Sequence, residues 1–194
     1  DDALTTFGPT ALPTMTHSNE STSAPRVFFA GTITQGVSGL RTFGIPANSG
    51  AVHGHRYNGR LSVDEIAQRY FGISRARPSV DPGTVVERLL TSASSAPELW
   101  HQKTYLAHAL SRDPGGVIHD EGIVSLAEYV DAAGPDGAAI TVETDDQGSI
   151  RPAVYVRRRG RVDADAVLDG SPLTEYRTPQ HRSQLRSLIA DVLA

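Results

Sequence analysis

The stretch RVFFAGTITQGVSGLRTFGIPANSGAVHGHRYNGR, residues 26–60, decides the fold that the sequence predicts. It opens on VFFA, an apolar run without alternation that is typical of a strand covered on both faces, so we expect a strand over residues 26–34. Gly31 ends the apolar run, and a ligand has room to approach the backbone where no side chain stands. A glycine-containing loop over residues 35–48 and a helix from residue 49 to about 71 complete the pattern.

The expected helix has a plausible start, because Asn48 or Ser49 can cap its exposed backbone amides. Small residues in its first turns, such as Gly50 and Gly54, permit close packing against a sheet or a cofactor. A strand, a glycine-rich loop and a helix in this order are typical of a nucleotide or flavin site. The G-x-G-x-x-G motif of a pyrophosphate-binding half follows no strand in the 194 residues, so that half of the site is missing from this sequence.

The composition, with 39% hydrophobic and 21% charged residues, is typical of an ordinary globular protein. The apolar runs are far shorter than the roughly 20 residues that span a bilayer, so we expect no membrane partner. The net charge of −4 argues against nucleic acid as a partner. The absence of cysteine excludes disulfides and thiolate chemistry, and it favours a cytoplasmic location.

The chain changes character at residues 75–84, where Pro78 and Pro82 interrupt regular structure and indicate a linker. We therefore predict a first domain over residues 1–74 and a small α+β domain over residues 85–194. Apolar spacings and the turn sequence DDQGS predict the elements of the second domain: helices over 84–92 and 97–112, a β-hairpin of strands 138–144 and 150–158, and a helix over 179–193.

The two predicted domains differ in whether they can stand alone. Residues 85–194 have enough helices and strands to bury a core. One strand and one helix in residues 1–74 cannot offset the ordering entropy of a domain. The first domain is therefore expected to pack on the second, or on sequence that this chain does not contain.

Two phrases, LPTMTHSNESTSAPRVFFAGTITQG and IPANSGAVHGHRYNGR, resemble the carboxy-terminal flavin-contacting segment of two-dinucleotide-domain flavoproteins. This group comprises the pyridine-nucleotide disulfide oxidoreductases and the related flavin-dependent monooxygenases. The resemblance covers about residues 12–70. It implies that residues 1–74 are an α/β fragment, the last strand, loop and helix of an FAD-binding Rossmann-like domain. The second domain, with its hairpin and three or so helices, would be a carboxy-terminal extension.

The resemblance also implies the chemistry. The cofactors would be FAD and NAD(P)H, the partner an amino-terminal half or a separate subunit that carries G-x-G-x-x-G, and the substrate a small molecule. Because no cysteine pair occurs, a monooxygenase is favoured over a disulfide reductase. Thr32 stands where the family usually has an acid that binds the ribityl chain. The residues expected to contact flavin are Gly31, Thr32, Gln35, Ser49, Gly50 and Val52.

Other polar groups receive a structural interpretation. His53 and His55 point to different sides of a helix and cannot easily share a metal ion, so no metal site is predicted. His119, Asp120 and Glu121 are interpreted as a helix start with acids in its first turn. The serines of TSASSAP, residues 91–97, are assigned to a linker or a helix cap.

The basic residues are given structural roles as well. The run RRRGR, residues 157–161, is interpreted as exposed charge that protects a strand edge. Lys103, the only lysine, is expected on an exposed helix face. An alternative function remains open: a non-catalytic α+β binding or interaction subunit that completes a flavin site on another polypeptide.

Overall fold

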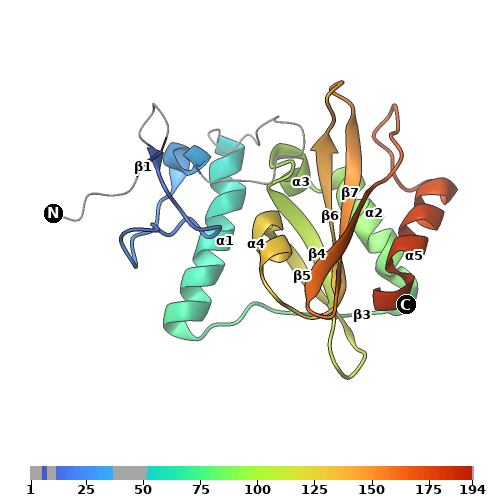
Figure 1. Cartoon of the computed structure of the whole chain (residues 1–194), viewed down its shortest axis with the longest axis horizontal. Coiled ribbons are helices and arrows are strands. Elements are labelled where there is room, and N and C mark those ends of the chain that lie inside the picture. Colours follow the sequence, from blue (N-terminus) through green and yellow to red (C-terminus); the bar gives the residue numbers. More distant parts are fainter. Residues whose placement is uncertain (1–5, 8–11, 37–51, 194) are drawn as a thin grey trace. The chain divides into compact units, whose positions relative to one another are not determined.

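The computed structural model describes residues 6–7, 12–36 and 52–193, which divide into two compact units (Figure 1). The described part of unit 1 lies within residues 6–75, and that of unit 2 spans residues 76–193. Each unit is considered by itself. No helix among the described residues is long and apolar enough to cross a membrane.

Unit 1 consists of a short strand pair, a 3-10 helix and one long α-helix. The strands β1 (Thr6–Phe7) and β2 (Leu12–Pro13) pair antiparallel. The 3-10 helix η1 (Gly31–Gly36) packs against α1 (Val52–Phe71). The expected helix over residues 49–71 is confirmed as α1 from Val52 onward, and its first three residues lie outside the described part of the chain.

The strand expected over residues 26–34 is wrong for this chain. Phe28 forms one isolated bridge with Glu20, and Gly31–Gly36 turn into η1. Residues 27, 29 and 30 belong to no strand, although they are not helical either. A buried strand needs neighbours for its backbone N–H and C=O groups, and the one sheet among the described residues of unit 1 is the two-residue β1/β2 pair, which this segment does not join.

Unit 2 is built on a six-stranded antiparallel sheet in the order β3-β5-β4-β6-β7-β8. The expected hairpin is confirmed: β6 and β7 pair from Gly137↔Arg157 to Thr144↔Ile150, and Gly148 in the connecting turn has φ +83°. A third strand, β8, extends the hairpin into a meander. The strands are β3 (Ser79–Val80), β4 (Leu106–Arg112), β5 (Ile118–Ser125), β6 (Gly137–Thr144), β7 (Ile150–Arg158) and β8 (Arg161–Val167).

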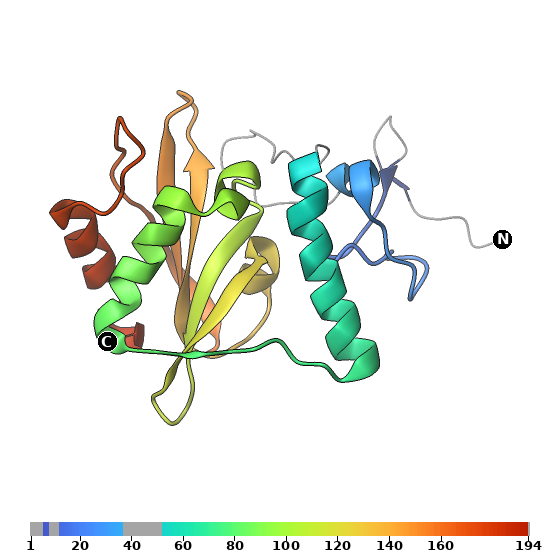
Figure 2. The ribbon, with the colours of Figure 1, turned by 180° about the vertical axis from the view of Figure 1, so that it is seen from behind.

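Helices cover both faces of this sheet, as Figures 1 and 2 show. On one face α2 (Val85–Ser95) and α5 (Pro179–Leu193) pack together and contact β4, β6 and, for α5, β7. On the other face the short α4 (Leu126–Asp131) lies over small residues, with Leu126 and Tyr129 packed against Ala107, Ala109 and Ala139. The expected carboxy-terminal helix over residues 179–193 is confirmed as α5.

The helix expected over residues 97–112 is wrong beyond its first turns. After η2 (Pro82–Thr84) and α2, helix α3 (Pro97–His101) ends early, and Thr104 adopts φ +61° before β4 begins. Strand β4 lies in the interior of the sheet with its residues from Leu106 to Ser111 all buried. Both faces of an interior strand are covered, so its sequence LAHALS shows no alternation and resembles a helix in its apolar spacing.

The coarse prediction of a fold that combines helices with a β-hairpin is confirmed for unit 2. Its core lies between the sheet and the α2/α5 pair, where Leu89, Leu90, Leu106, Leu110 and Leu185 are fully buried. A smaller cluster lies under α4. The sheet fixes the positions of the polar side chains described next, because β4 and β5 alternate their residues between the two faces.

Candidate functional site

The residues predicted to contact flavin fall partly within the described chain. Gly31 opens η1 with φ +82°, and a Cβ added there would meet no other atom within 4 Å. Thr32 is exposed, Gln35 lies in η1, and Val52 begins α1 with a side chain that is 75% exposed. Ser49 and Gly50 lie outside the described residues. The structure thus places the Gly31 turn on η1, which packs beside α1.

Polar side chains make many of the contacts among the described residues of unit 1. The Nδ2 of Asn19 donates to Ser62 Oγ at 2.7 Å, and Ser62 Oγ donates to the Asn58 carbonyl at 3.3 Å. Glu20 accepts from the backbone N–H of Arg26 at 2.7 Å and from the Arg69 guanidinium. The hydrogen bond from the Arg26 backbone is the main cause that lowers the pKa of Glu20. Burial opposes this effect, and the Arg69 guanidinium lowers the pKa further.

The two helix histidines behave as expected for an i, i+2 pair. His53 is exposed, whereas His55 is half-buried and its Nε2 has no hydrogen-bond partner. Among the described residues no group of three or more His, Cys, Asp or Glu side chains is arranged to hold a metal ion.

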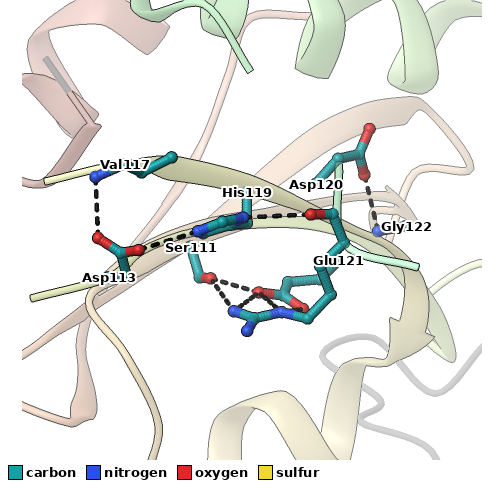
Figure 3. A network of polar contacts seen from close by, with 8 residues as sticks. Ser111, Asp113, Val117, His119, Asp120, Glu121 and Gly122 are labelled. Carbon is teal, nitrogen blue, oxygen red and sulfur yellow. Dashed lines mark hydrogen bonds and ion pairs between the residues drawn. The ribbon is translucent and has the colours of Figure 1, made fainter. Parts of the chain in front are cut away.

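His119, Asp120 and Glu121 do not start a helix; they lie on β5, and this prediction is corrected. His119 is opposite Ser111, Asp120 is opposite Leu110, and the register shifts at this point of the β4/β5 pairing. His119 and Glu121 reach one face of the sheet, and Asp120 reaches the other, where α2 lies. Figure 3 shows Asp120 directed away from Glu121. The acids were misassigned because the bulged register of β5 is set by its pairing with β4 and leaves no helical or alternating period in the sequence.

On the face that carries His119 and Glu121, residues of the linker form hydrogen bonds with the sheet. The guanidinium of Arg77 makes a bidentate contact with Glu121, with Nε–Oε2 at 2.8 Å, and also donates to Ser111 Oγ at 3.2 Å. The backbone N–H of Asp120 donates to the Pro78 carbonyl at 2.9 Å. Burial alone would raise the pKa of Glu121, but the hydrogen bonds from Arg77 and Ser111 lower it overall.

His119 joins this linker to the β4/β5 turn. Its Nε2 lies 3.0 Å from Asp113 Oδ2, and its Nδ1 lies 3.2 Å from the Arg77 carbonyl. Both partners are acceptors, so both contacts are made as hydrogen bonds only when the ring carries two protons. The Asp113 hydrogen bond is the main cause that raises the pKa of His119, and the same bond is the main cause that lowers the pKa of Asp113.

On the opposite face four polar side chains connect α2 to β4 and β5, and we call them the Ser92 quartet. Ser92 Oγ lies 2.5 Å from His108 Nδ1, and His108 Nε2 lies 2.8 Å from Asp120 Oδ1. Asp120 Oδ1 also accepts from the Gly122 N–H at 2.7 Å, and its Oδ2 accepts from Arg88 at 2.7 Å. Burial alone would raise the pKa of Asp120, but His108, Gly122 and Arg88 together lower it to about 2.

A separate cavity of about 360 Å³ opens elsewhere in unit 2. The three carboxylates at its wall are already engaged: Asp113 contacts His119, Asp191 contacts Arg158, and Asp136 accepts from the Gly160 N–H at 3.3 Å. Neither the Ser92 quartet nor the predicted flavin residues line it. Its lining residues are Arg112, Asp113, Pro114, Gly134, Pro135, Asp136, Asp191 and Val192.

The arginine run 157–161 is not simply an exposed edge, and that interpretation is corrected. Arg157 is only 7% exposed, stacks over the Tyr129 ring at 3.9 Å and donates to the Tyr129 carbonyl. Arg158 contacts Asp163 and Asp191, and these hydrogen bonds raise its pKa. Lys103 lies in the turn before β4 rather than on a helix, donates to the Trp100 carbonyl at 2.8 Å, and burial lowers its pKa.

Comparisons with protein-family models, curated proteins and solved structures find no match for this chain. Any function proposed for it therefore depends on the positions and contacts of its own residues.

The Ser92 quartet was missed at the level of sequence. The sequence assigns Ser92 to a linker or cap, whereas it lies in the last turn of α2. One signal was present: His108 interrupts an apolar run, and a histidine inside a buried strand needs polar partners. Which side chains would meet it depends on the packing of α2 and on the β4/β5 register, and neither can be read from local pattern.

Proposed function

We propose that residues 1–74 are the last segment of an FAD-binding domain and that the chain is the carboxy-terminal part of an FAD-dependent, NAD(P)H-using oxidoreductase of monooxygenase type. The main observation in its favour is that the described part of unit 1 buries polar side chains and exposes apolar ones. Tyr57 is the one large hydrophobic side chain that is buried among its described residues, while polar side chains fill its interior. Those polar residues are Asn19, Glu20, Ser21, Thr34, Asn58 and Ser62.

Apolar side chains of the same unit face outward. Val27, Val63 and Phe71 are 42%, 63% and 71% exposed, and Ile73 is 63% exposed. Burying such side chains stabilises a protein by about 1.5–3 kcal/mol each, so a unit that leaves several uncovered favours a missing partner surface. The proposed partner is the half of the flavin domain that carries G-x-G-x-x-G.

The segment before Gly31 supports the same proposal. Residues 27–30 are not helical, and their one bridge to Glu20 leaves most of their backbone outside any ladder. The segment leads directly into Gly31, where the proposed flavin contact begins. Gly31, with its positive φ and the free space around it, would then let the backbone approach FAD.

Alanine substitutions at Gly31 and Gly72 distinguish a loss of flavin contact from the backbone strain that both substitutions introduce. Gly31 and Gly72 both have positive φ, and a Cβ at either would meet nothing within 4 Å. In the protein that contains the G-x-G-x-x-G half, Gly31→Ala is expected to lower FAD occupancy about tenfold, whereas Gly72→Ala retains it. The flavin absorbance per protein, measured after purification, gives the answer. Equal occupancy in both variants would overturn the flavin contact at Gly31.

The chain by itself provides the second test. If it forms one wall only, the purified chain is colourless and takes up no added FAD, and co-expression with the G-x-G-x-x-G half gives a yellow complex. Reading the coding sequence upstream decides whether that half lies on the same polypeptide. If no such motif is encoded there or in a neighbouring gene, and no complex binds flavin, the oxidoreductase proposal fails. A motif on a separate polypeptide would favour the alternative of a non-catalytic subunit that completes a flavin site.

A further inference from the structure

The Ser92 quartet holds a hydroxyl, an imidazole and a carboxylate in one line. Ser92 lies on α2, His108 on β4 and Asp120 on β5, so three elements of the packed sheet-and-helix body fix the three groups. The hydroxyl-to-ring contact is 2.5 Å and the ring-to-carboxylate contact is 2.8 Å. A nucleophile beside a base that a third group orients is the arrangement that activates serine.

The proton positions follow from the donors and acceptors. Asp120 is ionised at neutral pH because its pKa is lowered to about 2, so it only accepts hydrogen bonds. His108 Nε2 must therefore carry a proton and donate it to Asp120 Oδ1. In the neutral ring Nδ1 is then bare and accepts from the Ser92 hydroxyl at 2.5 Å, a closer acceptor than the Arg88 carbonyl, to which the same hydroxyl can donate at 3.2 Å. Ser92 is thus paired with a base in the correct tautomer, with Nδ1 in the role that Nε2 has in the familiar serine triads.

Arg88 lies on the same helix as Ser92, and its guanidinium is paired with Asp120. It lies one helical turn before Ser92 on α2, and its guanidinium contacts Asp120 Oδ2 while its side chain remains 45% exposed. Residues four apart on a helix share a face, so the guanidinium and the hydroxyl point to the same side. An oxyanion that forms on a group attached to Ser92 would lie near this cation, which would stabilise it.

We propose that the Ser92 quartet is a nucleophilic site that takes small carboxylic esters and hydrolyses them. Ser92 Oγ attacks the ester carbonyl carbon as its proton passes to His108 Nδ1. The bond to the leaving alkoxide then breaks, the alkoxide takes that proton and departs as the alcohol, and the acyl group stays on Ser92. Water attacks the acyl carbon and gives one proton to His108. The Ser92–acyl bond breaks, Ser92 recovers the proton, and a carboxylic acid is released.

Labelling of the full chain with a fluorophosphonate probe tests the site directly, without any flavin. The probe is expected to add once, at Ser92, as seen by intact mass and peptide mapping. Ser95 is the matched control, because it lies on the same helix and donates to the Thr91 carbonyl at 2.8 Å with no histidine beside it. Ser92→Ala should abolish labelling, and Ser95→Ala should leave it unchanged.

Turnover of p-nitrophenyl acetate distinguishes catalysis from a structural hydrogen bond. His108→Gln and Asp120→Asn are expected to lower the acylation rate about 10²-fold or more, as loss of a general base or its orienting group does. Because the buried His108 variant can unfold, Ser92→Ala and Asp120→Asn are checked for folding by circular dichroism. No labelling, labelling that survives Ser92→Ala, or equal rates in folded Asp120→Asn would overturn the proposal.

Discussion

Leu89, Leu106 and Leu185 of unit 2 are fully buried, whereas Val52, Val63 and Phe71 of unit 1 are 75%, 63% and 71% exposed. The two units differ in what their elements can cover. Unit 2 has a sheet with helices on both faces, so its central strands are covered on both sides. The described part of unit 1 has one long helix and short irregular segments, and polar side chains make up most of its buried residues. The contrast indicates that a local apolar pattern becomes a strand or a core only where a matching surface exists.

Truncating one apolar side chain in each unit should give the largest contrast. Leu106→Ala, on β4, is expected to lower the free energy of unfolding by about 2–5 kcal/mol because it leaves a cavity in a closed core. Val63→Ala, on the outer face of α1, should change it by less than about 0.5 kcal/mol. Urea denaturation followed by circular dichroism measures both. A large loss from Val63→Ala would mean that unit 1 is covered within this chain.

Two glycines give the next contrast, of opposite sign. At Gly137 on β6 an added Cβ would lie 2.2 Å from the Leu110 carbonyl oxygen and 2.9 Å from Ser111 Cα, both backbone atoms. Gly137→Ala should therefore destabilise unit 2 by about 1–3 kcal/mol, since the paired strands must separate. At Gly59 on α1 nothing lies within 4 Å.

Gly59→Ala should stabilise the chain by about 0.5–1 kcal/mol, because alanine favours a helix over glycine. The same substitution made in the protein that contains the proposed flavin half separates two cases. If Gly59→Ala also stabilises that larger protein, Gly59 faces solvent in it. If the stabilisation disappears, the partner surface covers Gly59. Thermal unfolding of the two variants in both proteins is the measurement.

Exposed apolar side chains at the end of α1 should bind a hydrophobic dye. Phe71→Ser and Ile73→Ser are expected to reduce the fluorescence of bound anilinonaphthalene sulfonate and to change the unfolding free energy by less than about 0.5 kcal/mol. Leu173 in unit 2 is 85% exposed but stands apart from this group in sequence, and Leu173→Ser serves as the control. An equal reduction in the Leu173 variant would remove the distinction between the two units.

The sequence predicted best the elements whose cause is local. The hairpin of β6 and β7 follows from DDQGS, because Asp145 Oδ1 accepts from the N–H groups of Gln147 and Ser149 and Gly148 provides the positive φ. Helix α5 follows from its apolar stripe, in which Leu185, Ile189 and Val192 are buried. The turn pattern spans residues 145–149 and the apolar stripe spans residues 185–192, so each is contained in one short window of sequence.

Elements whose neighbours lie far along the chain were misassigned. Strand β4 was predicted as helix because burial on both faces removes its alternation. The strand expected before Gly31 is absent because no sheet among the described residues receives it. The Ser92 quartet could not be predicted either, since Ser92, His108 and Asp120 meet only through the packing of α2 on a bulged strand pair. A buried histidine in an apolar run was the one local indication.

The smallest effect concerns one ion pair in each unit, and pH should separate them. Because the pKa of His119 is raised in the folded state, its contact with Asp113 stabilises unit 2 fully below the unfolded value of about 6.5, and this contribution is lost as pH rises through the raised pKa. His119→Gln should thus lower the melting temperature at pH 6 and leave it nearly unchanged at pH 9.

The unit 1 pair lacks this dependence. Arg69 keeps its charge throughout that range, and the pKa of Glu20 is lowered, so their contact persists from pH 6 to pH 9 and weakens only in acid. Arg69→Gln is therefore expected to lower the melting temperature equally at both pH values. The test is whether the loss of melting temperature depends on pH in the His119 variant and not in the Arg69 variant, with both measured at one ionic strength. A His119→Gln effect as large at pH 9 as at pH 6 would show that the ring holds the linker by packing rather than by its second proton.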